Sequence, residues 1–180
     1  MKKNNINSCC SSSNCCSTPN NKDFCKKSII IDFLYLDVTI CERCQGTDNS
    51  LDEAISEVSK VLEATDVEVI VNKINVISEE LARKYKFITS PTIRINGNDI
   101  QMNYKESLCE SCGDLCGDDV DCRVWVYEGN EYTKPPKAMI IEAILKEVYG
   151  GGNAKQEELD YIIPDNLLKF YNAKKIKDTR

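Results

Sequence analysis

The sequence predicts an α/β fold in which a sheet is flanked by helices, and three observations carry the prediction. A dense apolar run over residues 28–36 is typical of a buried strand. Alternating valines from Val67 to Val71 indicate a second strand. Between the two, apolar residues recur at helical spacing over residues 50–64. Strands and helices that alternate in this way pack as a sheet covered by helices.

The first strand ends shortly before the CxxC motif formed by Cys41 and Cys44. Ser50 and Glu53 then make a Ser-x-x-Glu capping box, so the predicted helix starts at Ser50 and covers residues 50–64. On this interpretation both cysteines precede the helix. They would therefore lie outside the helix N-terminus, whose partial positive charge lowers the pKa of a thiol.

The second half of the chain contains further elements, again read from local signals. Ser78 starts a predicted short helix over residues 78–86, and Ser90-Pro91 opens a strand. Asn96-Gly97 after that strand is a strong signal for a tight turn. A Gly/Asp-rich loop, a hairpin, an apolar helix and a short C-terminal helix are predicted over residues 104–122, 123–133, 138–149 and 165–171.

Composition divides the 180 residues into three segments. Residues 1–27 are rich in Ser, Asn and Cys and poor in aliphatic side chains, so we expect a disordered tail. Residues 28–149 have the length of one domain. Residues 150–180 begin with three glycines, which predict a flexible joint before the C-terminal segment.

The chain has eleven cysteines, ten of them clustered, and no histidine, so its chemistry is expected to depend on sulfur. The net charge of -6 argues against nucleic acid or an anionic membrane surface as partner. No stretch reaches the ~20 apolar residues of a membrane span. The basic first residues are not followed by an apolar run, so they do not form a signal peptide. We therefore expect a cytoplasmic protein, in which thiols stay reduced.

The CxxC after the first strand, together with Ser90-Pro91 at the start of a later one, resembles thioredoxin-like proteins. The segment from Ser90 to Gly97, followed by Cys-Glu-Ser-Cys-Gly-Asp from Cys109, resembles a prokaryotic family catalogued only as a domain of unknown function. The resemblance covers about residues 28–149 and implies a thioredoxin-like sheet. It also implies that the peptide bond before Pro91 is cis and that Pro91 lies against the CxxC. On the same resemblance, the backbone at Ser90 and Pro91 receives a substrate.

The motif lacks the preceding Trp and the internal Gly-Pro of thioredoxin itself. The leading hypothesis is nevertheless a thiol–disulfide oxidoreductase without a cofactor, acting on an oxidised protein or small thiol. Cys41 would attack as a thiolate and Cys44 would resolve the mixed disulfide. The alternative is that the two cysteines hold a metal or a static bond.

A second group of cysteines consists of Cys109, Cys112, Cys116 and Cys122. Four thiolates can surround one zinc ion in a closed tetrahedral site. Their spacing matches neither common ferredoxin pattern, which argues against an iron–sulfur cluster. Alternatively, two of them face the CxxC and exchange disulfides with it.

The N-terminal tail carries two adjacent pairs, Cys9-Cys10 and Cys15-Cys16. Adjacent cysteines poorly satisfy the geometry of a disulfide within the pair. Thiolates are preferred ligands of soft ions such as Cu(I), Hg(II), Zn(II) and trivalent arsenic. The tail resembles those of arsenic and heavy-metal handling proteins, so the alternative function is soft metal or metalloid binding, unless the pairs have no role.

Overall fold

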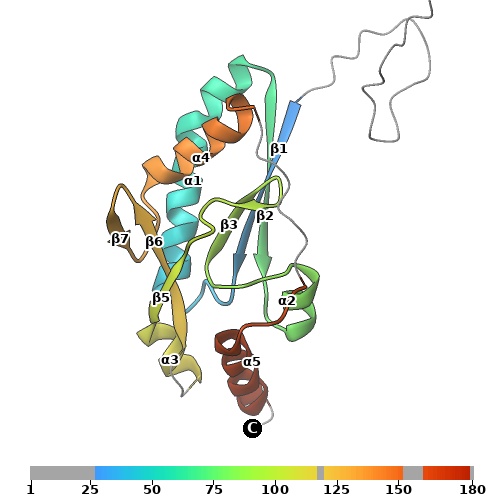
Figure 1. The fold of residues 1–180 in the computed structure, drawn as a ribbon, viewed down its shortest axis with the longest axis vertical. Helices are drawn as coiled ribbons and strands as arrows, with labels where there is room; N and C mark the ends of the chain where they lie inside the picture. The colour runs from blue at the N-terminus through green and yellow to red at the C-terminus, as the bar shows by residue number, and fades with distance from the viewer. Residues whose placement is uncertain (1–26, 117–119, 152–159, 179–180) are drawn as a thin grey trace, which may run out of the picture.

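The computed structural model describes residues 27–116, 120–151 and 160–178. These residues form an α/β fold of two sheets flanked by five helices (Figure 1). The predicted fold class is therefore confirmed. The elements in chain order are β1 (Lys27–Tyr35), α1 (Glu42–Ala64), β2 (Val67–Asn75), α2 (Glu79–Lys84), β3 (Thr92–Ile95), β4 (Asn98–Asp99), β5 (Lys105–Leu108), α3 (Glu110–Cys116), β6 (Asp121–Tyr127), β7 (Asn130–Tyr132), α4 (Lys137–Tyr149) and α5 (Asp165–Asp178).

The larger sheet has the strand order β2-β1-β3-β4. β1 and β2 run parallel and are joined through α1, whereas β3 pairs antiparallel with β1 and with β4. A parallel pair requires such a crossover, and a helix supplies it. This arrangement is compatible with the thioredoxin-like sheet that the sequence resemblance implies. The smaller sheet has the order β5-β6-β7.

The main core lies between the larger sheet and helices α1 and α4, which run side by side (Figure 1). In β1, Ile29, Ile31 and Phe33 are buried while Ile30 is 41% exposed. This alternation follows from the two-residue period of a strand. Trp125 of β6 is fully buried in the same core and so joins the smaller sheet to the larger one.

A second buried cluster lies at the other end of the sheet, next to α2, α3 and α5. The C-terminal helix α5 buries Leu167, Phe170 and Tyr171 there, and the Tyr161 hydroxyl donates a hydrogen bond to the Phe87 carbonyl. The C-terminal segment therefore packs on the rest of the chain. The buried cysteines belong to this second cluster.

The predicted start of the first long helix at Ser50 is wrong, because α1 begins at Glu42. The buried residues Cys44, Thr47, Leu51 and Ala54 follow one another at spacings of three and four, so a single helical face continues back to the CxxC. Burial of that face favours the helical conformation over the local capping signal. Ser50 consequently lies inside the helix.

The predicted loop over residues 104–122 is also wrong, because it contains β5 and α3. All four residues of β5 are exposed, so its sequence has no hydrophobic alternation. Its conformation is maintained by backbone pairing with β6. Lys105 pairs with Val124 at one end of the strand and Leu108 with Asp121 at the other. The sequence of such a strand gives little indication of its conformation.

The other predicted elements agree with the structure to within a few residues at most ends, although β2 extends to Asn75 and α5 to Asp178. At the predicted tight turn, Asn96 and Gly97 have φ values of 51° and 85°. Both residues thus adopt the left-handed conformation that this dipeptide favours. No helix in the described ranges is both long enough and apolar enough to cross a membrane.

Candidate functional site

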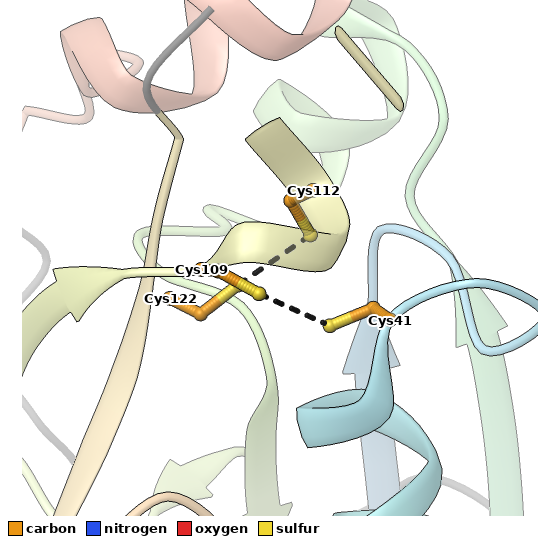
Figure 2. A group of neighbouring side chains, drawn as sticks. All are labelled: Cys41, Cys109, Cys112 and Cys122. Carbon is orange, nitrogen blue, oxygen red and sulfur yellow. Dashed lines mark hydrogen bonds between the residues drawn. The ribbon is translucent and has the colours of Figure 1, made fainter. Parts of the chain in front are cut away.

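Four thiols from distant parts of the chain converge on one point (Figure 2). The Sγ atoms of Cys41, Cys109, Cys112 and Cys122 all lie within 4.8 Å of one another. The Sγ atoms of Cys41 and Cys109 are 3.8 Å apart, and those of Cys112 and Cys122 are 3.6 Å apart. The four residues are 0%, 3%, 1% and 0% exposed in chain order. They are free thiols, and we call them the four-sulfur site.

Cys41 occupies the N-cap position of α1, and the Cys44 amide lies 3.4 Å from its Sγ as a donor. The expectation that the cysteines precede the helix is therefore wrong. The Cys41 amide in turn donates to the Asp37 carbonyl, which fixes the loop after β1. A thiol at an N-cap faces backbone donors and the positive end of the helix dipole, and both stabilise a thiolate.

The other three thiols come from the β5–α3–β6 segment, which we call the three-cysteine segment after Cys109, Cys112 and Cys122; it also contains Cys116. Cys109 lies between β5 and α3, and its amide donates to the Val120 carbonyl across the segment. Cys112 is in the first turn of α3 and donates its amide to the Cys109 carbonyl. Cys122 lies in β6 opposite Ser107 of β5. Strand pairing and one helical turn thus bring these sulfurs together.

The thiols of the site strongly influence one another. Hydrogen bonds from neighbouring thiols, led by that of Cys109, lower the pKa of Cys41, and burial opposes this shift. A hydrogen bond with Cys112 is the main cause that lowers the pKa of Cys109 to about 7. The Cys109 thiol is also the main cause that raises the pKa values of Cys112 and Cys122. A first thiolate is favoured, whereas several thiolates this close repel one another unless a cation lies between them.

Cys44 is buried but lies outside the four-sulfur site. Its Sγ is 3.5 Å from the Oγ of Ser90, which also accepts a hydrogen bond from the Leu36 amide. The peptide bond between Ser90 and Pro91 is cis. The Ser90 carbonyl already accepts a hydrogen bond of 2.7 Å from the Arg123 amide of β6. The hydrogen bond with the Cys41 thiol, followed by burial, raises the pKa of Cys44.

The structure thus combines one cysteine of the CxxC with three of the second group. Sequence reasoning assigned Cys41 to redox chemistry and grouped the other three with Cys116, whose side chain lies outside the described residues. No local signal links Cys41 to Cys109, because 67 residues separate them. The predicted tail ligands also lie outside the described residues: Cys9, Cys10, Cys15 and Cys16.

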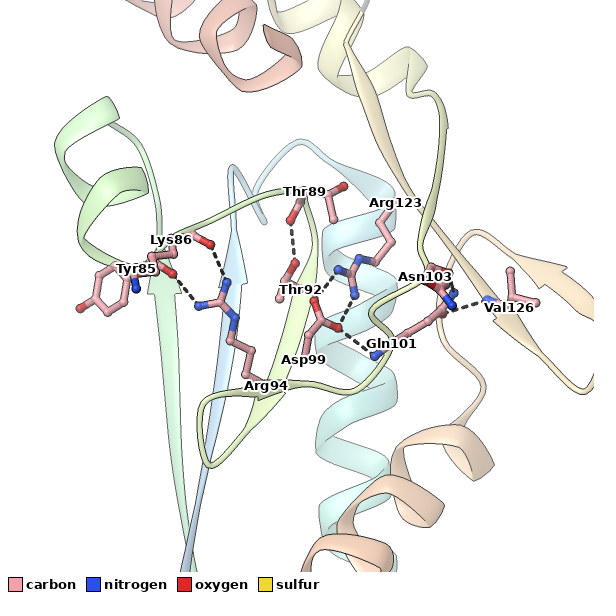
Figure 3. Close-up of polar contacts among 10 residues, drawn as sticks. All are labelled: Tyr85, Lys86, Thr89, Thr92, Arg94, Asp99, Gln101, Asn103, Arg123 and Val126. Carbon is pink, nitrogen blue, oxygen red and sulfur yellow. Dashed lines mark hydrogen bonds and ion pairs between the residues drawn. The ribbon is translucent and has the colours of Figure 1, made fainter. Parts of the chain in front are cut away.

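A buried ion pair involves the residue that follows Cys122 in the chain, and sequence reasoning missed it (Figure 3). The guanidinium of Arg123, the residue after Cys122, donates two hydrogen bonds of 2.8 and 2.6 Å to the Asp99 carboxylate. The guanidinium carbon also lies 4.8 Å from the ring centre of Trp125 and 5.2 Å from that of Tyr104. The hydrogen bonds to Asp99 of β4 anchor β6, which carries Cys122, to the larger sheet.

An open cavity of about 690 Å³ adjoins the site at Cys109, the most exposed of the four cysteines. Charged side chains of both signs line it, among them Glu42, Glu110, Asp114 and Lys134. Of the residues that line this cavity, Cys109 is the one that belongs to the four-sulfur site.

Residues 29–144 match a family model described as "Domain of unknown function (DUF2703)". Comparison with curated proteins and with solved structures finds no match. The matched range contains all four cysteines of the site as well as Cys44, Ser90 and Arg123. Because the match covers more than half of the chain, this protein belongs to the DUF2703 family.

Proposed function

We propose that this protein binds one soft metal ion through the thiolates of Cys41, Cys109, Cys112 and Cys122. The observation that carries the proposal is the approach of four buried sulfurs to within 4.8 Å of one another. Thiolates prefer soft ions, and four of them form a closed coordination shell.

The sulfur spacing supports a single ion. A zinc–thiolate bond of about 2.3 Å places tetrahedral ligands about 3.8 Å apart. The Sγ–Sγ separations of Cys41 with Cys109 and of Cys112 with Cys122 are 3.8 Å and 3.6 Å. A polynuclear cluster would need a wider spacing, because its core has to fit between the thiolates. The spacing therefore favours mononuclear binding over an iron–sulfur cluster.

The chemistry of the site favours binding over metal-catalysed hydrolysis. A catalytic zinc site keeps one position open for water or substrate, whereas four protein sulfurs fill a tetrahedral shell. The ion would also offset the repulsion among the thiolates. It would link α1 to the three-cysteine segment, so that binding energy stabilises this junction.

Thiol–disulfide exchange by Cys41 and Cys44 is the second candidate. The N-cap position of Cys41 and the amide donor of Cys44 favour a thiolate there. However, both residues are 0% exposed, and attack on a partner's disulfide requires access. The nearby Ser90 carbonyl already accepts a hydrogen bond from Arg123, and binding of a substrate at Ser90 and Pro91 stays a prediction. We therefore rank exchange second.

The test uses the full chain with Cys9, Cys10, Cys15 and Cys16 replaced by Ser, so that the two adjacent cysteine pairs of the tail do not contribute. This parent protein is prepared without oxygen or chelator and titrated with Co²⁺, whose absorption reports thiolate coordination. We expect one equivalent to bind with the spectrum of a four-thiolate tetrahedral site. Cys122→Ser should change the spectrum and weaken binding, whereas Cys44→Ser is the matched control and should retain both.

Two results would reject the proposal. One is a parent protein that does not bind one equivalent of cobalt. The other is a Cys122→Ser variant whose cobalt affinity and spectrum equal those of Cys44→Ser. The exchange function is supported instead if the parent reduces a small disulfide and if Cys41→Ser and Cys44→Ser both lose this activity to the same extent.

A further inference from the structure

Arg43, inside the CxxC motif, contacts both strands of the three-cysteine segment. From Nη1 it donates hydrogen bonds to the Ser107 carbonyl at 3.3 Å, the Ser107 hydroxyl at 3.0 Å and the Cys122 carbonyl at 3.1 Å. From Nη2 it donates to the Leu108 carbonyl at 2.7 Å. One side chain of α1 thus has four acceptors on β5 and β6.

These acceptors lie next to the ligands of the proposed metal site. Leu108 immediately precedes Cys109, and the Cys122 carbonyl belongs to a ligand residue itself. Arg43 in turn lies two residues after Cys41, in the first turn of α1. The guanidinium therefore links the helix that carries one sulfur to the two strands that flank the other three.

We propose that Arg43 is a positioning residue that holds Cys41 against the three-cysteine segment and thereby makes the site four-coordinate. This inference rests on the proposed function. A planar guanidinium can bond several carbonyls at fixed angles, which a lysine ammonium cannot reproduce. Its positive charge also lies beside a site whose four thiolates would leave a net negative charge around a divalent ion.

The consequence is a difference between ions. Zn²⁺ and Co²⁺ need all four sulfurs for a tetrahedral thiolate shell. Arsenite, As(OH)3, exchanges its three hydroxyls for three sulfurs, and each thiol proton leaves with a hydroxyl as water; Cys109, Cys112 and Cys122 supply three sulfurs from one segment. Loss of Arg43 should therefore weaken binding of the divalent ions while binding of arsenite is retained.

The experiment compares Arg43→Met with the parent protein that lacks the four tail cysteines. Affinities for Co²⁺ and for arsenite are measured by competition, and the cobalt spectrum is recorded at saturation. Removal of a residue that orients metal ligands typically lowers affinity about 10- to 100-fold, which we expect for Co²⁺. The spectrum should shift towards that of a site with fewer thiolates, as in Cys41→Ser.

Two further variants make the test specific. Arg43→Lys retains the charge but has a single nitrogen, so its cobalt affinity should lie between those of the parent and Arg43→Met. Lys60→Met removes an exposed cation from the same helix and should leave both affinities within about twofold. Arsenite affinity should stay within the same range in all of these variants.

An unchanged cobalt affinity and spectrum in Arg43→Met would overturn the inference. An equal loss for cobalt and arsenite would also overturn it, because that pattern indicates a general structural effect. If Arg43→Met does not fold, the same comparison is decided by Arg43→Lys. A parent protein that binds no cobalt would reject the proposed function, which distinguishes that failure from a failure of the role of Arg43.

Discussion

Replacement of Arg123 by Met is predicted to destabilise the protein strongly, because it leaves a buried carboxylate without its partner. The side chains of Arg123 and Asp99 are 0% and 3% exposed. Their two hydrogen bonds measure 2.8 and 2.6 Å. Within the described residues, the Asp99 carboxylate would keep only the hydrogen bond from the Gln101 amide, so the effect should be that of a buried pair broken on one side.

Breaking a buried ion pair by removing one partner typically destabilises a protein by about 3–5 kcal/mol. An exposed pair contributes only about 0–1 kcal/mol. The burial of both Arg123 and Asp99 places this pair in the first class. For a chain of this size, the expected decrease in melting temperature is roughly 6–20 °C, at about 2–4 °C per kcal/mol.

The free energy of unfolding is best measured by urea denaturation of protein in chelator, so that metal binding does not contribute. Lys137→Met is the matched control, because it breaks the exposed pair with Glu57 and should leave this free energy close to the parent value. The double variant Arg123→Met/Asp99→Leu should recover part of the loss, since no unpaired charge stays buried. A loss below about 1 kcal/mol in Arg123→Met would refute the argument.

Three more predictions follow from the site and the core. Introduced into the parent protein that lacks the paired tail cysteines, Cys44→Ser should retain one equivalent of Zn²⁺ by elemental analysis, and loss of zinc would mean that Cys44 is a ligand. Removal of zinc by a chelator should lower the free energy of unfolding, measured in urea, by about 4 kcal/mol relative to protein with free zinc at 1,000 times its Kd. Equal stability with and without zinc would contradict binding to the folded state. Phe33→Ala should lose about 3–5 kcal/mol in the same assay because Phe33 is fully buried in the main core, whereas a loss similar to that of an exposed residue would contradict this packing.

Most of the larger sheet and its helices could be predicted from local patterns in the sequence. The dense apolar run over residues 28–36 predicted β1, in which Ile29, Ile31 and Phe33 are buried. Asn96 and Gly97 tolerate the left-handed conformation that the turn requires. In both cases the structural cause acts within a few residues.

The start of α1 and the strand β5 were not predictable in this way. A capping box at Ser50 is a valid local signal, but burial of Cys44 and Thr47 extends the helix towards the CxxC. β5 has four exposed side chains, and its strand conformation depends on pairing with β6. Interactions with another part of the chain decided both elements.

The sequence by itself determined that the chain is rich in cysteine and has no histidine, that a CxxC follows the first strand, and that further cysteines gather after residue 108. Only the tertiary structure decided which thiols meet: Cys41 joins Cys109, Cys112 and Cys122, while Cys44 lies beside Ser90. The physical reason is that the spacing of a motif determines the distances between side chains only over a few residues of the chain. The approach of sulfurs 68 positions apart depends on how α1 packs against β5, α3 and β6.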